Sequence, residues 1–385
     1  MSDHSANSGR RPLLAIALGG GGARAAYQVG VLRGISHRFP DLKTPFLTGV
    51  SAGAINVAHL ANHTGSFQQK CCELTDLWRN LSFENVFSVE PVKLLARILR
   101  VGLRLTIRLP RGVPRAQGMV DTSPLRTFLH RGLGTDDGVL RGIGKNISRG
   151  EIIAVAITAL NYRTGETHTF VEGKEIERWE RPLRKSVHLP LTVEHVMASA
   201  ALPLLFPAVK IDDAWYGDGG IRQVAPLSPA IHLGADRLLV LSTHYQVPCS
   251  GPALEKTIGP PSPAVVLGAL YTAVFLDQLD QDVLQMERLN DLIRFTDEQH
   301  RNGFREVTTT VICPQADIGA IANKYERKMP RTFRYFMRRF GSDETKQQDF
   351  ISTVMFHPGF LGEVLDLGEQ DAARYADQVA TLLEP

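Results

Sequence analysis

The sequence predicts an α/β protein with a mainly parallel central sheet. Short, continuous apolar runs of strand length alternate along the chain with segments of helical periodicity, which is the pattern of strands covered by helices on both faces. Two of these runs end in glycine-rich turns that lead straight into a predicted helix. Because ligands bind at the carboxyl ends of parallel strands, these two turns are expected to lie side by side in a functional site.

The first predicted strand, Leu13 to Leu18, leads into the glycines at 19 to 22 and then into a predicted helix around Tyr27. Backbone N–H groups in such a loop at a helix start can bind an anion. The loop is therefore a dinucleotide cradle, an oxyanion hole for acyl transfer, or merely a tight turn. The dinucleotide fingerprint is incomplete, because Ala25 stands at its last glycine and Asp41 precedes the second strand instead of ending it.

The second predicted strand starts at Pro45 and ends in Gly49-Val50-Ser51-Ala52-Gly53, which a predicted helix to Ala61 follows. This G-x-S-x-G pattern is expected of a nucleophile elbow, where the serine sits on a strained turn with its hydroxyl exposed. Gly49 and Gly53 would let strand and helix pack closely. Ser51 is therefore the candidate nucleophile, and its place beside the first glycine loop favours the oxyanion hole. The alternative is a glycine-rich turn that happens to hold a serine.

Three motifs occur in one order between residues 19 and 220: GGGGARAAYQVGVL, GVSAG, and Asp218-Gly219-Gly220 after the run ASAALP. In this order they resemble the patatin-like phospholipase family. The resemblance implies a three-layer patatin-like fold and a Ser/Asp dyad, in which Asp218 takes the proton of Ser51 and no histidine is required. It also implies the remaining site residues, namely Gly20, Gly21 and Gly22 as the oxyanion hole, and Gly219 and Gly220 beside the aspartate. Arg24 matches the family's basic position and is expected to hold the glycine loop, with contact to the acyl substrate as the alternative.

Two alternatives for Asp218 stay open at this point. Asp-Gly is a common turn dipeptide, so the motif could be an ordinary turn. A triad is the second alternative, since His232 and His244 both follow Asp218, in the chain order of α/β-hydrolases. The chain departs from the family pattern at Ala25, where glycine is usual, and at Gln223, where asparagine is usual, and no role is assigned to Gln223.

A run of cations lies between the elbow and the aspartate. From Pro91 to Val120 there is no aspartate or glutamate, and three- and four-residue spacings place the cations on one side of a predicted helix whose other side is apolar. Such a basic amphipathic helix is typical of contact with an anionic membrane surface. A surface helix packed on its own core is the alternative. The cations are Lys93, Arg97, Arg100, Arg104, Arg108, Arg111 and Arg115.

The rest of the chain completes the predicted organisation. Residues 1–11 are expected to be disordered, 12–246 to form the hydrolase domain, 247–263 a linker, and 264–385 a mostly helical extension. Residues 121–150 hold six glycines and are expected to be a loop-rich connection. Further strands are predicted at 152–159, 167–171, 208–211 and 307–313, and Leu238 to Leu241 is expected to be the last strand of the core sheet.

Composition narrows the class of protein. A hydrophobic content of 43% with a formal net charge of +3 is ordinary for a globular protein and gives no support to nucleic-acid binding. The four cysteines form no C-x-x-C pair, and the first apolar run is too short for a signal peptide. These features predict a reduced cytoplasmic protein, and the lipid substrate that the resemblance implies adds an expected peripheral place on the inner membrane face.

The function expected is hydrolysis of acyl esters, foremost those of glycerophospholipids, without a metal or an organic cofactor. Two alternatives remain open. An acyltransferase would use the same acyl-enzyme and pass the acyl group to another alcohol in place of water. A membrane-associated scaffold with a decayed active site would keep only the basic docking segment. Oligomeric state is not predicted by any feature of the sequence.

Overall fold

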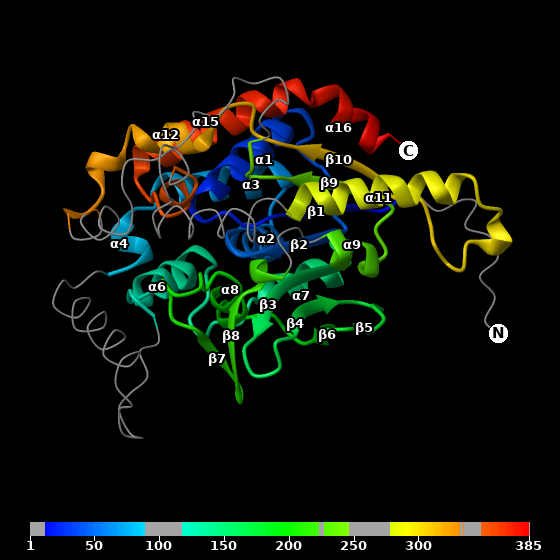
Figure 1. Ribbon diagram of the computed structural model, residues 1–385, viewed down its shortest axis with the longest axis horizontal. Helices are drawn as coiled ribbons and strands as arrows, with labels where there is room; N and C mark the ends of the chain where they lie inside the picture. Colours follow the sequence, from blue (N-terminus) through cyan, green and yellow to red (C-terminus); the bar gives the residue numbers. More distant parts are fainter. Residues whose placement is uncertain are drawn as a thin grey trace, which may run out of the picture.

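The computed structural model describes residues 12–88, 118–222, 227–245, 278–331, 334 and 348–384. Several predicted features lie outside these ranges: the disordered N-terminus 1–11, the linker 247–263, and the basic segment with Lys93, Arg97, Arg100, Arg104 and Arg108. Within the described ranges, one large mixed sheet runs through the molecule between layers of helices (Figure 1).

The sheet has ten strands in the order β10-β9-β1-β2-β3-β4-β6-β5, and β8 pairs with both β3 and β7. The five strands from β10 to β3 are mutually parallel, whereas β4 and β8 run antiparallel to β3. The prediction of a mainly parallel α/β sheet is confirmed. The strands are β1 Leu14–Leu18, β2 Phe46–Val50, β3 Ala154–Asn161, β4 Thr167–Gly173, β5 Glu180–Arg181, β6 Arg184–His188, β7 Val209–Ile211, β8 Ala214–Asp218, β9 Arg237–Leu241 and β10 Thr308–Ile312.

Alternate residues of β1 enter two different hydrophobic cores, one on each face of the sheet. Leu14, Ile16 and Leu18 belong to the larger core, and Ala15 and Ala17 to the smaller one. This alternation is the period of two that a strand imposes on its side chains. The larger core is covered by α1 Ala26–Arg38, α2 Ala52–Asn62, α3 Phe67–Arg79 and α15 Pro358–Arg374, and the smaller by α9 Leu227–Leu233 and α11 Gln278–Arg294.

Shorter helices surround these layers within the described ranges. They are α4 Phe83–Val86, α6 Ser123–Gly132, α7 Arg141–Ser148, α8 Val193–Ser199, α12 Ile318–Asn323, α14 Gln348–Thr353 and α16 Ala376–Leu383, with the 3₁₀ turns η1 Gly22–Ala25, η2 Gly219–Ile221, η3 Glu298–His300 and η4 Glu326–Lys328. The predicted helical C-terminal region is therefore present. No helix in the described ranges has the length and apolar composition needed to span a bilayer.

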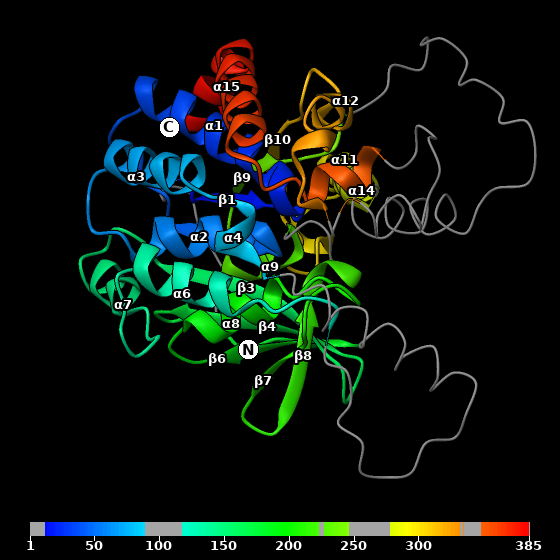
Figure 2. The ribbon, with the colours of Figure 1, turned by 90° about the vertical axis from the view of Figure 1, so that its left-hand side faces the viewer.

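The C-terminal helix α15 packs along α1, as both ribbon views show (Figures 1 and 2). Glycines allow this close approach, because a Cβ at Gly30 would lie 1.9 Å from the carbonyl oxygen of Leu365, and one at Gly368 would lie 2.2 Å from that of Tyr27. The buried carboxylate of Asp371 on α15 accepts a hydrogen bond of 3.1 Å from the Tyr27 hydroxyl on α1. Helix α1, the first helix that covers the sheet, is thus itself covered by α15 from the C-terminal part of the chain.

The structure corrects two expectations about secondary structure. Leu238 to Leu241 is not the last strand, because β10 pairs in parallel with β9 and extends the sheet by one strand. Residues 121–150 are not a loop-rich connection, since they form α6 and α7. A glycine within α7 explains the error: a Cβ at Gly142 would lie 1.8 Å from the carbonyl oxygen of Asn62, so this glycine permits close packing and does not mark a loop.

Three strands were not predicted. The short strands β5 and β6 lie at the edge of the sheet and are largely polar, so they lack the apolar run that marks a buried strand. Strand β8 has five residues and follows β7 after a tight turn at Asp212 and Asp213. Its buried half, Tyr216 to Asp218, is too short to be recognised from hydrophobicity alone.

Candidate active site

Four segments meet at the carboxyl edge of the parallel strands. The glycine loop follows β1, Ser51 follows β2, and Thr243 follows β9. Asp218 is the last residue of the antiparallel β8, and it pairs with Ala159 near the end of β3. The sheet topology therefore brings Asp218 to the same edge as the glycine loop and Ser51.

Ser51 lies on a sharp turn between β2 and α2. Its φ of 55° and ψ of −130° are a left-handed backbone conformation that residues other than glycine rarely adopt. The two flanking glycines are required sterically, because a Cβ at Gly53 would lie 2.4 Å from the carbonyl oxygen of Leu18, and one at Gly49 would lie 2.7 Å from that of Gly53. The strand, the strained serine and the helix have the arrangement of a nucleophile elbow.

The Ser51 hydroxyl donates a hydrogen bond of 2.6 Å to Oδ2 of Asp218. The other carboxylate oxygen, Oδ1, accepts a bond of 2.8 Å from the backbone N–H of Gly220. Gly219 is needed for a close approach, since a Cβ there would lie 2.3 Å from the carbonyl oxygen of Thr158. The Asp-Gly-Gly motif therefore fixes the carboxylate against β3 and points one oxygen at the serine.

Burial sets the pKa of Asp218 in this pair. Asp218 is fully buried and Ser51 is 6% exposed. Burial raises the pKa of Asp218 to about 7, and the hydrogen bonds from Ser51 and Gly220 oppose this rise. A carboxylate with a pKa near neutrality can accept a proton from an attacking hydroxyl and return it within one reaction cycle.

No histidine takes part in this contact. Among the residues that the structure describes, neither Ser51 nor Asp218 hydrogen-bonds to a histidine. His232 lies on α9, where its Nδ1 contacts the carbonyl oxygen of Ser228 at 2.8 Å. The backbone N–H of His244 donates to the Ser242 hydroxyl. The geometry is therefore that of a serine and aspartate pair.

The glycine loop lies directly against Ser51. A Cβ at Gly20 would lie 3.0 Å from Cβ of Ser51, and the carbonyl oxygen of Gly20 accepts a bond of 2.8 Å from the Thr243 hydroxyl. Gly21 and Gly22 adopt positive φ values of 146° and 57°, conformations that glycine adopts without steric strain. Ala25, where the family pattern has glycine, has a φ of −65°. An alanine therefore fits at this position without strain.

Arg24 supports this loop from the protein interior. Its side chain is fully buried, and its Nε donates to the carbonyl oxygen of Thr243 at 3.0 Å. Its Nη1 donates to the hydroxyl of Ser352 at 3.3 Å. Arg24 thus joins the first glycine loop to the end of β9 and to α14.

Sequence reasoning missed Ser199, a fully buried residue at the end of α8. Its hydroxyl accepts a bond of 3.0 Å from the backbone N–H of Ser51 and donates one of 2.7 Å to the carbonyl oxygen of Thr158. Ser199 therefore holds the strained backbone of Ser51 on β3. The sequence signal for Ser199 is that it is the polar residue within the apolar run ASAALP.

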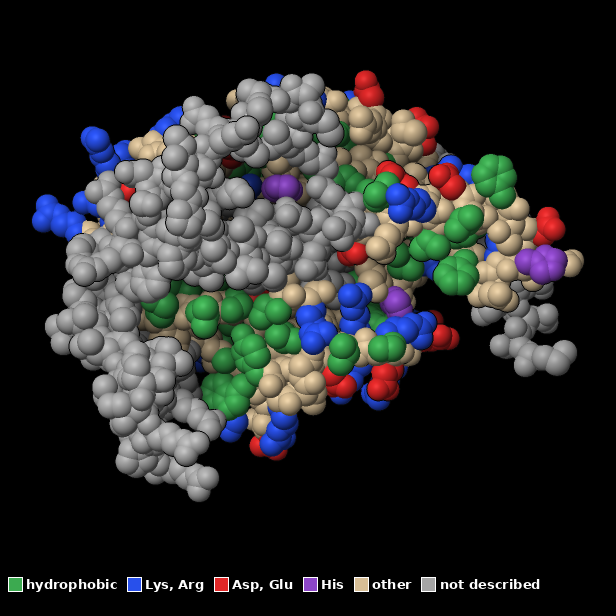
Figure 3. Space-filling model, in the orientation of Figure 1, with side chains coloured by type: hydrophobic (Ala, Val, Ile, Leu, Met, Phe, Trp, Pro, Cys, Tyr) green, Lys and Arg blue, Asp and Glu red, His purple; other side chains and the backbone are tan. Residues whose placement is uncertain are grey.

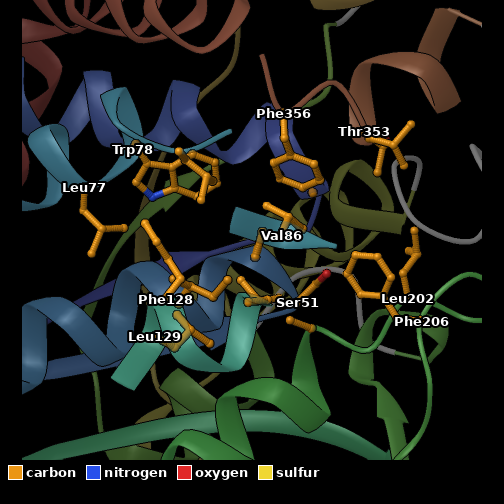
Figure 4. A pocket seen from close by; sticks show the side chains of 17 residues that line it. Ser51, Leu77, Trp78, Val86, Phe128, Leu129, Leu202, Phe206, Thr353 and Phe356 are labelled. Atoms are coloured by element: carbon orange, nitrogen blue, oxygen red, sulfur yellow. The ribbon is translucent and has the colours of Figure 1, made fainter. Parts of the chain in front are cut away.

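An apolar cavity opens beside Ser51. In Figure 4 the Ser51 side chain lies between Leu77, Trp78, Phe128 and Leu129 on one side and Leu202 and Phe206 on the other. The sequence analysis assigned no site residue to the C-terminal region, yet three of its residues line this cavity. They are Thr353, Val354 and Phe356.

The fold and the site together define a three-layer α/β protein with a serine on a strand-to-helix elbow beside a buried aspartate. The chain belongs to the patatin-like phospholipase family, because the family model matches residues 16–231, more than half of its length. A search of curated protein sequences finds no significant match.

Several solved structures are similar at low sequence identity. Human GIVD cytosolic phospholipase A2 is 13% identical, with a TM-score of 0.49, over 97% of this chain and 60% of the human one. VipD from Legionella pneumophila is 11% identical, with a TM-score of 0.31, over 93% of this chain and 67% of that one. The type III effector ExoU is 16% identical, with a TM-score of 0.32, over 92% of this chain and 54% of that one. The chain thus spans about 60% of the human protein.

Proposed function

We propose that this protein is a serine acyl hydrolase of the phospholipase A type, which cleaves acyl esters of lipids with a Ser51/Asp218 dyad. One observation carries the proposal: the hydroxyl of a serine on a strained elbow donates to a fully buried aspartate at 2.6 Å. Strain and burial at one pair of residues are costly to a fold, and they are typical of catalytic sites. Family membership adds support for a lipid substrate.

In the first half of the reaction, Oγ of Ser51 attacks the ester carbonyl carbon while its proton passes to Oδ2 of Asp218. Backbone N–H groups of Gly20, Gly21 and Gly22 would hold the oxyanion of the tetrahedral intermediate, a contribution of about 3 kcal/mol for each well-placed donor. Collapse of this intermediate breaks the bond to the leaving alcohol, which takes the proton from Asp218. An acyl-enzyme on Ser51 remains.

In the second half, a water molecule attacks the acyl-enzyme and gives its proton to Asp218. Oγ of Ser51 leaves and recovers that proton, and the fatty acid is released. Arg24 and Ser199 touch no reacting atom in this scheme. They are positioning residues, because Arg24 holds the glycine loop and Ser199 holds the backbone of Ser51.

The apolar cavity beside Ser51 would take the acyl chain. Its lining is almost entirely hydrophobic, and Trp78, Phe128 and Phe356 contribute large apolar surfaces. The free space between these side chains is about 40 Å³, which is room for about three water molecules. A long acyl chain would therefore enter by displacing cavity side chains.

The test compares the wild type with Ser51→Ala and Asp218→Asn on mixed anionic phospholipid vesicles, with released fatty acids and lysolipids identified by mass spectrometry. The wild type is expected to release both products, and each variant should lose at least about a thousandfold in rate. Ser148→Ala, at an exposed serine on α7, is the control and should keep full activity. Undiminished release by Ser51→Ala would refute the dyad.

The same experiment separates the two alternatives. Added glycerol would yield acylglycerol if another alcohol competes with water for the acyl-enzyme, and this outcome would make the protein an acyltransferase. Vesicle binding without any product would favour the scaffold. Peripheral contact through the basic segment 93–108 and a cytoplasmic location also belong to this proposal, and vesicle sedimentation of the Ser51→Ala variant measures the membrane contact directly.

A further inference from the structure

In the loop 202–206 beside the active site, side chains close together in the chain point in opposite directions. Leu202 and Phe206 line the apolar cavity, and Leu205 is buried. Leu204, between them, is 75% exposed and has a φ of 66°. A leucine in this left-handed conformation is strained by about 1 kcal/mol, and it gains no packing in return. The loop thus holds one large apolar side chain in solvent at the wall of the cavity.

A second exposed apolar side chain lies on the same side of the molecule. Trp215 on β8 is 40% exposed and lines a surface crevice together with Pro207, which lies three residues after Leu204. Lys210 on β7 is its cross-strand partner, so a cation lies beside the indole. Figure 3 shows hydrophobic side chains gathered on this face over α6, α8 and the β7–β8 hairpin. We call the exposed residues Leu204, Trp215 and Lys210 the loop surface.

Both ends of the segment 89–117 lie close to this place. Ser88 and Asp121 pair through two backbone hydrogen bonds, so the chain between them leaves and returns at one point. That point adjoins the loop surface, because the backbone N–H of Met119 donates to the carbonyl oxygen of Leu204. Between residues 91 and 120 the sequence holds seven lysines and arginines and no acidic residue. An exposed leucine and tryptophan near the two ends of a segment whose charged residues are all cationic match the surface of an anionic bilayer.

We propose that the loop surface docks on an anionic phospholipid bilayer, with Leu204 and Trp215 entering the interface beside the mouth of the cavity. The inference rests on the proposed function only for the choice of a lipid partner. In the docked state the apolar part of a lipid would lie next to Leu204, one loop turn away from the cavity-lining residues Leu202 and Phe206. The strain at Leu204 would then be offset by burial of its side chain in the membrane.

The test is co-sedimentation with vesicles of equal parts phosphatidylcholine and phosphatidylserine, carried out in the Ser51→Ala background so that no lipid is consumed. Leu204→Asp and Trp215→Ser are each expected to weaken vesicle binding by about tenfold or more. Leu183→Asp is the matched control, since Leu183 also has a positive φ of 61° and is 50% exposed, but it lies at the turn between β5 and β6. The Leu183→Asp variant should bind vesicles as tightly as the Ser51→Ala parent.

Leu204→Gly distinguishes docking from a folding defect. Glycine adopts the φ of residue 204 without strain, so thermal stability should stay equal or rise while vesicle binding falls. A structural role for Leu204 would move both quantities downward. Vesicle binding equal to the parent in Leu204→Asp and Leu204→Gly, or absence of vesicle binding by the parent itself, would overturn the proposal.

Catalysis is measured separately, on a soluble short-chain ester below its micellar concentration and with Ser51 intact. Leu204→Asp should keep the wild-type rate on this substrate and lose about tenfold on vesicle phospholipid. Equal loss on both substrates would count against docking. If the wild type cleaves neither substrate while the Ser51→Ala parent binds vesicles, the proposed function fails and the docking surface stands.

Discussion

The guanidinium of Arg24 donates a hydrogen bond to the hydroxyl of Ser352, although 328 residues separate them along the chain. The residue after Ser352 approaches the same loop, since a Cβ at Gly22 would lie 2.2 Å from the carbonyl oxygen of Thr353. Thr353 and Phe356 also line the cavity beside Ser51. The glycine loop near the start of the chain and the segment 352–356 near its end therefore form one continuous wall.

Replacing Arg24 by lysine should weaken both the fold and the site. Lysine keeps the charge, but a single ammonium group cannot reproduce the fork that contacts Thr243 and Ser352. We expect the free energy of unfolding to fall by about 2 kcal/mol and the rate on a soluble ester to fall with it. Urea denaturation and ester hydrolysis measure the two effects. Arg79→Lys, at an exposed ion pair with Asp366, should change stability by less than about 0.5 kcal/mol.

Ending the chain at residue 263 should prevent folding. The predicted hydrolase domain, 12–246, would then lack β10, which pairs with β9, and α15, which covers α1. Exposure of the apolar face of α1 and of the sheet edge predicts aggregation. Soluble expression, circular dichroism and ester hydrolysis of the shortened chain test this directly. A soluble, active protein of residues 1–263 would show instead that the C-terminal region is a separable extension.

Local patterns predicted the centre of the fold and the candidate dyad. The apolar run before Gly19, the elbow around Ser51 and the Asp-Gly-Gly motif at Asp218 each carry their information within a few neighbouring residues. The buried strands were predictable for the same reason, because β1 and β3 are fully buried along their length. Motif order then related Ser51 to Asp218, although the sequence alone contains no measure of the distance between them.

Contacts between distant segments were not predictable in this way. Ser199 supports Ser51 only because α8 is packed beside β3, and its place in the run ASAALP marks a polar residue among apolar ones without indicating its partner. Thr353 reaches the glycine loop because α15 returns the chain to α1. The glycine at 142 was misinterpreted because close packing and chain turning both require the same residue type. Such features follow from tertiary packing and not from local pattern.

Gly53→Ala should disrupt the elbow. The new methyl carbon would lie 2.4 Å and 2.5 Å from the carbonyl oxygens of Leu18 and Gly19, which are backbone atoms that cannot move independently. We expect a loss of stability of about 3 kcal/mol and loss of ester hydrolysis. Gly362→Ala on α15 is the matched control, because nothing lies within 4 Å of its added Cβ. That variant should be more stable by up to about 1 kcal/mol, and equal behaviour of the two variants would contradict the steric argument.

Asp218 should make activity and stability respond to pH in opposite directions. Its pKa is raised from 3.8 to about 7 by burial, so the carboxylate that accepts the Ser51 proton forms only as the pH rises through neutrality. The rate constant kcat/KM on a soluble ester should therefore climb from pH 5 and level off above about pH 8. A rate that stays constant between pH 5 and pH 8.5 would contradict a pKa near 7 for Asp218.

Stability follows the opposite course because of the same raised pKa. Between about pH 4 and pH 7 the folded protein holds a proton on Asp218 that the unfolded chain has released, so the folded state binds more protons. The contribution of Asp218 is thus most favourable below pH 4 and is lost as the pH rises to 7, at up to about 1.4 kcal/mol per pH unit. Asp218→Asn cannot titrate, so its free energy of unfolding should increase relative to that of the wild type from pH 5 to about pH 7, and the difference should then stay constant to pH 8. Urea denaturation at several pH values measures this difference, and a difference that does not change with pH would show that Asp218 is already charged in the folded protein at pH 5.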